Sequence, residues 1–462
     1  MSPAFRSLAV FGLALAASAT ASWSGAPAEM AMAAGLLVFT IGFWALALLP
    51  EALTGLIFFV AAIVSGMAPP ATVFAGFTTG AFWLVFAGLL LGAAVGETGL
   101  SRWLLERMLP VRRLAEGEVA YGTLIAAVVT FSGGLGLLLP ATSGRVVLLV
   151  PLILALADRL NYAADSRGRT GMVVAGVVAT FVIPITILPA NLPNLVLAGS
   201  LEALYGVKLT YGAYLALHFP VIGLTKAIAL TLIVTRLFGE RPGGRAELAA
   251  VAAPPLSPGG RRLGLLLVVT LALWATDVVH GIGAAWVGLT AAILCLLPRS
   301  GILAFKSLSS GPFMPLLLYV GAVLGLAAVM TESGLGAALG AWLIERLPLA
   351  EAGPFAILTG LAALGAGSGL LATLPAAPAI AAPLFPEIAR LTGWSIEAIG
   401  MAQVLGYATP LFPYQVPPFI VAMAMTGIGA AAFTRTLWWL ALTTTPVMLG
   451  LAYPWWSLLG WL

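Results

Sequence analysis

Long apolar stretches recur along the whole chain, and they constrain its fold more than any other feature. Only 8% of the 462 residues are charged, whereas a soluble domain carries about a quarter. Inside a bilayer every backbone polar group needs a partner within the protein, so apolar segments of this length cross as helices. The sequence therefore predicts an all-α polytopic membrane protein.

The two halves of the chain carry the same motifs in the same order, which indicates an internal duplication. Thr79 corresponds to Ser310 in this comparison, and Pro189 corresponds to Pro413. Single matches arise easily in a biased composition, but a series of ordered matches favours a repeat of one unit. The matching segments are 43–44 with 273–274, 79–82 with 310–313, 97–100 with 332–335, Pro140 and Pro151 with Pro375 and Pro386, and 189–193 with 413–417.

This duplication divides the chain into four predicted parts. They are an N-terminal helix at 1–29, a first repeat at 30–237, a cytoplasmic linker at 238–262 and a second repeat at 263–462. The linker is polar and rich in glycine and proline. Residues 5–22 are apolar and end in small residues, so they form either a retained first helix or a cleaved signal peptide.

Each repeat also contains one interrupted segment, at 119–159 and at 350–391. Both segments have two apolar arms around a glycine-rich stretch, at 133–136 and 365–369. We expect the chain to turn at these glycines and to form a re-entrant hairpin. The predicted spans are 30–49, 51–67, 77–96, 171–200 and 211–237 in the first repeat, and 263–279, 283–298, 311–330, 395–427 and 434–461 in the second.

Five crossings in each repeat is an odd number, so the second repeat is expected to be inverted relative to the first. Together with the N-terminal helix, the chain then has about eleven spans. Lys and Arg concentrate in the loops that this topology places in the cytoplasm, as the positive-inside rule requires. The sequence predicts a multi-pass protein of the cell (inner) membrane, with its N-terminus in the cytoplasm and its C-terminus outside.

A polar motif opens the second arm of the first hairpin and is a candidate substrate-binding site. Its residues are Thr142, Ser143, Gly144 and Arg145. The free N–H groups and the dipole of a helix that begins here would attract an anion. Arg145 strengthens this attraction, because a guanidinium among apolar residues needs an anion, a carboxylate or a cavity beside it. The alternative is that Arg145 extends along its aliphatic stem to the cytoplasmic surface.

Two spans contain too many prolines for a regular helix. Residues 184–194 hold three prolines, so carbonyl groups freed from helical hydrogen bonds can act as ligands there. Asn191 and Asn194 add side-chain amides to this first break. Tyr414 and Gln415 take comparable positions in the second repeat. The alternative is a kink whose amides only satisfy the backbone.

No combination of residues predicts catalysis or nucleic-acid binding. His218, His280 and Cys295 lack the spacing of a metal site or of a catalytic triad. The net charge of +4 comes from bases in short loops beside apolar segments, which orient a membrane protein and do not indicate nucleic acid. Lys226 is a further charge inside an apolar span, and it is either buried or turned towards one surface.

Several motifs are typical of one transporter family. They are Pro-Ala-Thr-Ser-Gly-Arg at 140–145, Leu-Pro-Glu-Ala-Leu-Thr at 49–54, Ala-Leu-Trp-Ala-Thr-Asp at 272–277 and Pro-Leu-Phe-Pro at 410–413. With these motifs the chain resembles, over nearly its whole length, the divalent-anion:sodium symporters of the ion transporter superfamily. The resemblance implies two inverted repeats, a Ser-Asn-Thr triplet at each hairpin tip and two sodium ions beside the substrate. It also implies a homodimer with an elevator-like mechanism.

Both triplets depart from the family's pattern. The residues at the second tip are Ala376, Ala377 and Pro378, which have no side-chain oxygen. The sodium site that the resemblance implies at the first tip would lie near Ala141, Thr142, Ser143 and Ala190. Arg145 offers a fixed positive charge in place of a mobile ion, which makes sodium coupling doubtful and favours exchange or uncoupled transport.

The sequence therefore predicts a secondary active transporter of small anions, either a dicarboxylate or an inorganic oxyanion such as sulfate. Alternating access, elevator-like, would carry the anion across the membrane. The expected partners are a small anionic substrate, the lipid bilayer and a second copy of the chain. No cofactor is expected apart from Na⁺ as a coupling ion. The alternatives are an oxyanion or metabolite exporter and an anion channel.

Overall fold

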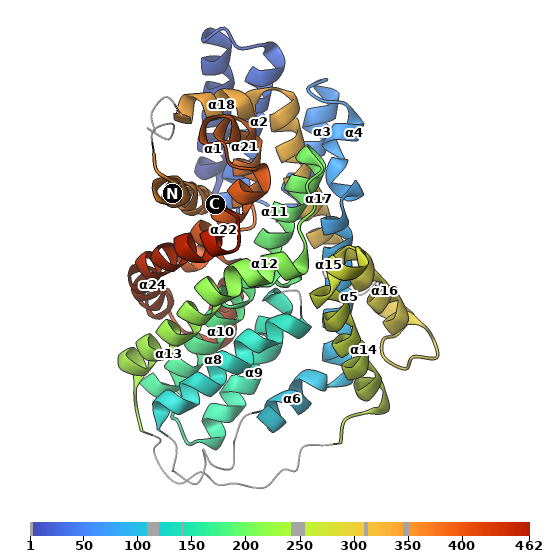
Figure 1. The fold of residues 1–462 in the computed structure, drawn as a ribbon, viewed down its shortest axis with the longest axis vertical. Helices are drawn as coiled ribbons and strands as arrows, with labels where there is room; N and C mark the ends of the chain where they lie inside the picture. Colours follow the sequence, from blue (N-terminus) through green and yellow to red (C-terminus); the bar gives the residue numbers. More distant parts are fainter. Residues whose placement is uncertain (1–2, 109–119, 140–141, 242–254, 309–312, 345–351) are drawn as a thin grey trace.

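The computed structural model describes residues 3–108, 120–139, 142–241, 255–308, 313–344 and 352–462. Throughout these residues the regular secondary structure is helical (Figure 1). Seven of the described helices are long and apolar enough to cross a membrane, and shorter apolar helices of 10–17 residues accompany them. The prediction of an all-α membrane protein is therefore confirmed as a class.

The first half begins with the paired helices α1 and α2 and later contains a helical hairpin, α8 and α9, followed by a broken helix, α10 to α11. In order these elements are α1 (Pro3–Trp23), α2 (Ala28–Ala45), α3 (Glu51–Val64), α4 (Pro70–Val73), η1 (Ala75–Thr78), α5 (Gly80–Thr98), α6 (Leu100–Met108), α8 (Tyr121–Leu138), α9 (Thr142–Arg159), α10 (Arg167–Val182), η2 (Pro184–Thr186), η3 (Leu188–Ala190), α11 (Leu192–Tyr205), α12 (Tyr211–His218), η4 (Phe219–Gly223) and α13 (Leu224–Phe238). The first helix packs along α2, where Val10 lies against Gly42.

The second half repeats much of this order. Its elements are α14 (Pro258–Ala275), α15 (Asp277–His280), α16 (Ala284–Leu296), η5 (Phe305–Leu308), α17 (Phe313–Glu332), α18 (Leu335–Ile344), α19 (Pro354–Leu371), α20 (Ala377–Ala381), η6 (Ala382–Leu384), α21 (Phe385–Thr392), α22 (Ile396–Tyr407), η7 (Pro413–Gln415), α23 (Pro417–Thr426) and α24 (Ala430–Leu458).

The prediction that the hairpins turn at their glycines is wrong. Helix α8 continues through 133–136 to Leu138, and α19 continues through 365–369 to Leu371. These glycines instead let backbones approach closely. A Cβ added at Gly136 would lie 2.4 Å from Pro184 Cγ, and one at Gly365 would lie 2.6 Å from a backbone oxygen of α22. The missing side chains thus bring each hairpin arm against a broken helix.

Prolines interrupt the two broken helices, as expected. Helix α10 ends at Val182 and is followed by the short turns η2 and η3, both of which contain a proline, before α11 begins. Proline lacks an N–H donor and its ring clashes with the preceding helical turn, so α10 cannot continue. In the second half, α22 ends at Tyr407 and α23 begins at Pro417.

The start of helix α14 falls within the range 238–262 that the sequence assigns to a linker. Helix α14 already begins at Pro258, because the side chain of Ser257 accepts a hydrogen bond from Gly260 N at 3.0 Å and caps the helix. Proline is favoured in the first helical turn, where its missing N–H costs nothing. The polar composition of 258–262 therefore reflects a helix start rather than a connecting loop. Residues 242–254 lie outside the described part of the chain.

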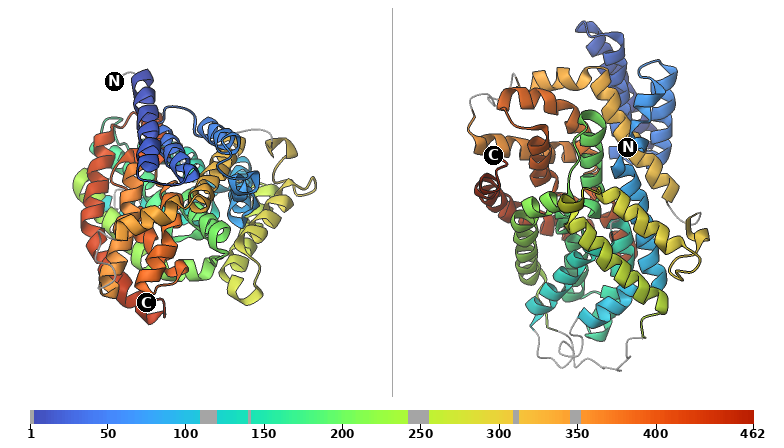
Figure 2. Two further views of the ribbon diagram at one scale, coloured as in Figure 1. Left: turned by 90° about the horizontal axis from the view of Figure 1, so that it is seen from above. Right: turned by 45° about the vertical axis from the view of Figure 1, so that its right-hand side comes forward.

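The two hairpins lie towards opposite ends of the molecule. In Figure 1, α8 and α9 of the first hairpin lie in the lower part and α21 of the second hairpin lies at the upper end, and the turned view in Figure 2 agrees. The halves interleave between these ends, because α9 of the first half packs against α23 of the second, and α11 packs against α17 and α20. The hairpins and broken helices of both halves therefore meet in the middle.

Candidate functional site

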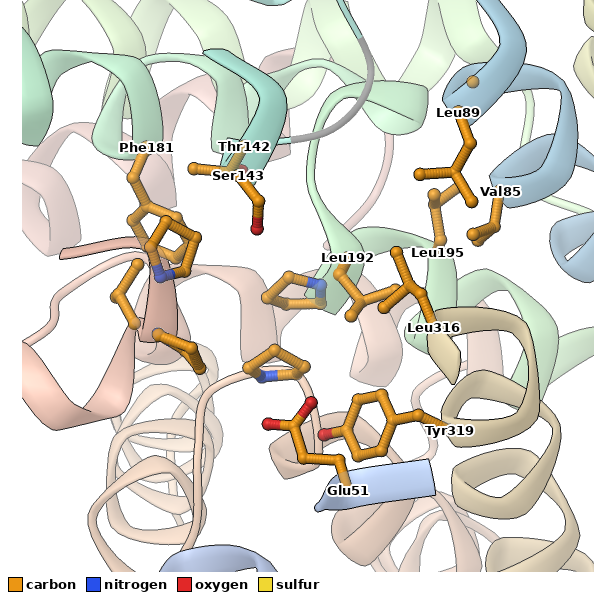
Figure 3. A pocket seen from close by; sticks show the side chains of 16 residues that line it. Glu51, Val85, Leu89, Thr142, Ser143, Phe181, Leu192, Leu195, Leu316 and Tyr319 are labelled. Carbon is orange, nitrogen blue, oxygen red and sulfur yellow. The ribbon is translucent and has the colours of Figure 1, made fainter. Parts of the chain in front are cut away.

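A cavity of about 110 Å³ lies where the two halves meet (Figure 3). Its walls come from the starts of α3, α9, α11 and α23, from α5 and α17, and from the tip of the second hairpin. The lining residues are Glu51, Val85, Gly88, Leu89, Thr142, Ser143, Phe181, Leu192, Pro193, Leu195, Leu316, Tyr319, Pro375, Val416, Pro417 and Pro418. Most of them are apolar, so a ligand here would be largely dehydrated.

The N-termini of α9, α11 and α23 converge on this cavity. Thr142 and Ser143 begin α9, Leu192 and Pro193 begin α11, and α23 begins at Pro417. Helix N-termini carry partial positive charge and attract anions. In α11 and α23 the first turn contains proline, which removes N–H donors but leaves the dipole of the remaining peptide units. The electric field in the cavity therefore favours a negatively charged ligand, while few backbone N–H groups remain to orient it by hydrogen bonds.

Ser143 points its hydroxyl into the cavity in Figure 3. The neighbouring Gly144 is exposed, and a Cβ added there would meet nothing within 4 Å. The predicted binding residues Thr142 and Ser143 thus line the cavity. Gly144 lies beside them without a close packing contact.

Arg145 is buried beneath the tip of the first hairpin and does not line the cavity. Its exposed fraction is 0%, so it does not extend to the membrane surface either. All three guanidinium nitrogens donate hydrogen bonds. Nη1 donates to Leu139 O and to Ala190 O at 2.8 Å. Nη2 donates to Thr142 Oγ1 at 3.0 Å, to Thr180 O at 2.8 Å and to Asn191 Oδ1 at 2.6 Å. Nε donates to Thr180 Oγ1 at 2.9 Å and to Thr180 O at 3.2 Å.

The oxygen atoms around Arg145 are all uncharged. They belong to backbone carbonyls, hydroxyls and one amide, so they satisfy the donors without neutralising the guanidinium. Buried hydrogen bonds of this kind hold the hairpin tip to the first break, since the partners come from α9, α10 and η3. Because Thr142 both contacts Arg145 and lines the cavity, an unneutralised positive charge lies directly behind the cavity wall.

The two asparagines of the first break are buried and act within it. Asn191 donates from Nδ2 to Phe181 O at 2.9 Å and accepts from Thr142 Oγ1 at 2.6 Å. Asn194 donates from Nδ2 to Ile185 O and Ile187 O, both at 3.0 Å, while its Oδ1 has no hydrogen-bond partner among the described residues. Neither side chain lines the cavity, so both position the break around it.

The second tip is closed by a neutral amide. Gln415 Nε2 donates to Gly369 O at 2.7 Å, and its Oε1 accepts from Leu411 N at 2.6 Å and Phe412 N at 2.9 Å. This arrangement ties the second break to the arm α19. In the register that the sequence predicts for the two breaks, Gln415 would take the position of Asn191.

The remaining predicted residues of the second tip also lie outside the cavity lining. Ala376, Ala377 and Pro378 are buried around the start of α20. Tyr414 is 41% exposed, stacks on Phe412 and donates to Leu370 O at 2.9 Å. Their neighbours Pro375, Val416 and Pro417 reach the cavity instead.

The oxygen atoms expected to hold sodium at the first tip are already bound to Arg145. Thr142 Oγ1 and Ala190 O both accept its hydrogen bonds, while Ser143 faces the cavity. Ala141 lies outside the described residues. The guanidinium thus stands where a sodium ion would need these ligands, and the two do not fit together.

Glu51 and Tyr319 line the cavity although the sequence interpretation did not select them. Glu51 lies in the motif 49–54 and is an acid at the start of an apolar span. Because charged residues inside membrane spans are usually functional, this position alone could have marked Glu51 as a candidate. Tyr319 is one of several aromatic residues in apolar helices, and nothing in its sequence surroundings marks it.

Lys226 is a second buried cation, at the second break. Its exposed fraction is 0%, and within the described part of the chain Nζ donates only to Thr409 Oγ1 at 3.4 Å and Thr444 Oγ1 at 3.5 Å. No acid lies within ion-pair distance of Nζ among the residues the structure describes. These long contacts compensate poorly for the lost hydration of an ammonium group.

Replacing Lys226 with methionine is expected to raise thermal stability, by about 1 kcal/mol or more, because the isosteric apolar side chain needs no hydration or partner. The midpoint of heat-induced unfolding in detergent measures this change. The exposed Lys208 provides the matched control, and the same substitution there should leave the midpoint unchanged. A lower midpoint for the Lys226 variant would show that the ammonium is better compensated than its contacts indicate.

Comparisons with known proteins give a family, a relative and a similar structure. The sequence matches the family described as "Sodium:sulfate symporter transmembrane region" over residues 8–462. A relative from Cupriavidus necator, described as "Membrane protein", is 25% identical over 405 residues, which are 84% of this chain and 76% of the relative. The crystal structure of the Alcanivorax borkumensis YdaH transporter matches with a TM-score of 0.58 and 19% identity, over 88% of this chain and 90% of that one.

Proposed function

Because the chain belongs to the sodium:sulfate symporter family, and is thus an integral membrane transporter rather than an enzyme, we propose that it is a secondary active transporter of small anions. Dicarboxylates and inorganic oxyanions such as sulfate are the proposed substrate class. The observation that carries this proposal is the cavity on which the N-termini of α9, α11 and α23 converge, with the guanidinium of Arg145 behind its wall.

An inverted duplication, with repeats at 30–237 and 263–462, is part of the proposal. Equivalent positions line the cavity from both sides, because Val85 and Gly88 correspond to Leu316 and Tyr319 in the register that pairs Thr79 with Ser310. Pro193 likewise corresponds to Pro417 in the register of the two breaks. The cavity is therefore built around the axis of the duplication. A binding site at a repeat interface suits transport by alternating access.

Arg145 supports transport without sodium at the first tip. Its donors occupy Thr142 Oγ1 and Ala190 O, and at the second tip Gln415 replaces an ion by amide hydrogen bonds. A fixed cation attracts an anion but cannot be released, so Arg145 cannot take the place of sodium as a coupling ion. We therefore favour exchange or uncoupled transport. About eleven spans, a cytoplasmic N-terminus, a homodimer and elevator-like movement complete the proposal.

Uptake into proteoliposomes tests this function. Labelled succinate, malate, citrate and sulfate are offered separately, with and without a sodium gradient and with each unlabelled anion inside. We expect saturable uptake of at least one anion, stimulation by the same anion on the opposite side, and no stimulation by sodium. Currents without such counterflow would indicate a channel, and the absence of any saturable flux would contradict the proposal.

Replacing Ser143 with tryptophan is expected to block this uptake, because an indole ring would fill most of a cavity of about 110 Å³. Uptake of the anion identified above should fall to the background of empty liposomes while the protein stays folded. Val147 lies one turn further along α9 and is half exposed outside the cavity, so the same substitution there is the matched control. Normal uptake by the Ser143 variant would remove this cavity from the transport route.

A further inference from the structure

Glu51 places a carboxyl group in the proposed anion cavity. It is the first residue of α3, is partly buried, and extends towards the interior of the cavity in Figure 3. Among the described residues its side chain has no hydrogen-bond donor and no ion-pair partner. Prolines and apolar side chains form most of the wall around it. An acid left without a partner in such a wall is an expensive feature for a cavity that receives anions.

Tyr319 lies beside Glu51 on α17. Its exposed fraction is 2%, and its hydroxyl has no hydrogen-bond partner among the described residues. Trp44 holds the two together, because its ring packs edge-on against Tyr319 with centroids 5.1 Å apart and its Nε1 donates to Glu51 O at 3.1 Å. The carboxyl and the hydroxyl are thus fixed on one side of the cavity as a polar pair with unused hydrogen-bonding capacity.

Few other ionisable groups belong to the elements packed against α3. Helix α2 carries Glu29 in its first turn, and α17 carries Tyr319 and, at its last residue, Glu332. Helix α4 carries none among its four residues. Glu29 and Glu332 do not line the cavity. On the opposite side, α9 contributes Arg145 behind Thr142.

The charge state of Glu51 therefore decides what the cavity can hold. With an ionised carboxylate, the negative charge on one wall opposes the positive charge of Arg145 behind the other, and an entering anion meets a like charge in an apolar space. With a protonated carboxyl, the positive charge of Arg145 and the helix N-termini act unopposed. The neutral carboxyl can also donate a hydrogen bond to the anion.

We propose that Glu51 is a proton-binding residue of the substrate cavity, so that each anion binds together with one proton taken from solution onto the Glu51 carboxyl. This inference rests on the proposed anion transport and adds its proton linkage. Because linkage is reciprocal, acid tightens anion binding and anion binding takes up a proton. When the anion leaves, the proton returns from the carboxyl to solution.

Sulfate binding to the detergent-solubilised full chain tests the inference. Sulfate keeps both charges between about pH 5 and pH 8, so any pH dependence belongs to the protein, whereas dicarboxylates must be corrected for their own titration. The dissociation constant of the wild type is expected to rise about tenfold per pH unit above the titration of the carboxyl. A pH-indicator dye in weak buffer should report about one proton taken up per anion bound.

Replacing Glu51 with glutamine should make the dissociation constant independent of pH and abolish proton uptake. The matched control is Glu332→Gln, an acid on a neighbouring element outside the cavity, which should behave as wild type. Tyr319→Phe should keep the proton stoichiometry, because it removes only a neighbouring hydroxyl. If Glu51→Gln does not fold, the dye measurement on wild type still decides, since binding without proton uptake overturns the inference.

The two proposals fail in different ways. Absence of binding or flux for sulfate and for every dicarboxylate over the whole pH range would contradict the anion transport itself. Binding that is independent of pH in wild type, or a pH dependence that persists unchanged in Glu51→Gln, would leave anion transport intact and reject the role of Glu51.

Discussion

Replacing Arg145 with alanine is expected to abolish transport and to lower the stability of the folded protein by several kcal/mol. The substitution removes the guanidinium donors from the carbonyl oxygens of Leu139, Thr180 and Ala190. Asn191 Oδ1 keeps only its hydrogen bond from Thr142 Oγ1. Each buried acceptor that loses its partner costs about 1–3 kcal/mol. It also removes the positive charge behind the cavity and the link between the hairpin tip and the first break. Anion uptake and the unfolding midpoint measure the two effects.

Arg390 is the matched control for this prediction. It lies on α21, is largely exposed and pairs only with Glu387 on the same helix, so alanine there should change stability by less than about 1 kcal/mol. In the Arg145 variant, sodium but not choline should restore part of the lost stability, because an array of uncharged oxygens suits a small hard cation. An Arg145 variant with wild-type uptake would show that the guanidinium takes no part in binding or positioning.

Replacing Gly406 with alanine is expected to prevent stable folding of the second half, at a cost of about 3 kcal/mol or more. The added Cβ would lie 2.0 Å from Ala362 O and 2.6 Å from Ala366 N, both backbone atoms of α19. Backbone cannot rotate away as a side chain can, so α19 and α22 would have to separate. That separation would also open the contact between the second hairpin and the second broken helix. Yield of monodisperse protein and its unfolding midpoint report the effect.

Gly367 on the facing helix α19 gives the control for close packing. A Cβ there would meet nothing within 4 Å, and alanine favours helix over glycine by up to about 1 kcal/mol. The Gly367 variant should therefore be as stable as wild type or slightly more so. Equal losses for the two glycines would mean that general helix flexibility, rather than the contact of α19 with α22, is what the substitutions disturb.

Local sequence predicted the helical class and the positions of the breaks. Residues 184–194 do not continue α10, because three prolines close together remove several of the donors that a helix requires. Single prolines are tolerated inside α9 and α24. The glycines at 133–136 and 365–369 were misinterpreted, because glycine permits a turn but does not force one. Whether it turns or lets two helices approach depends on the neighbours, here Pro184 and Gln403.

The candidate site was only partly predictable. Thr142 and Ser143 could be found because a half-helix begins at them, and they do line the cavity. For Arg145 the sequence predicted an anion, a carboxylate or a cavity beside it, with the membrane surface as the alternative. The structure instead surrounds it with uncharged oxygens from residues up to 46 positions away. Glu51 was passed over, since it reaches the cavity only through the packing of α3 against α17.

Composition and proline placement by themselves determined that this chain forms apolar helices with two breaks, because hydration and backbone hydrogen bonding act within a few residues. The tertiary structure alone decided which charges face the cavity and which are enclosed behind it. A buried charge takes its partners from whatever segments pack around it, and those segments are distant in the chain. The positive charge of Arg145 and the carboxyl of Glu51 thus come to lie on opposite sides of one cavity.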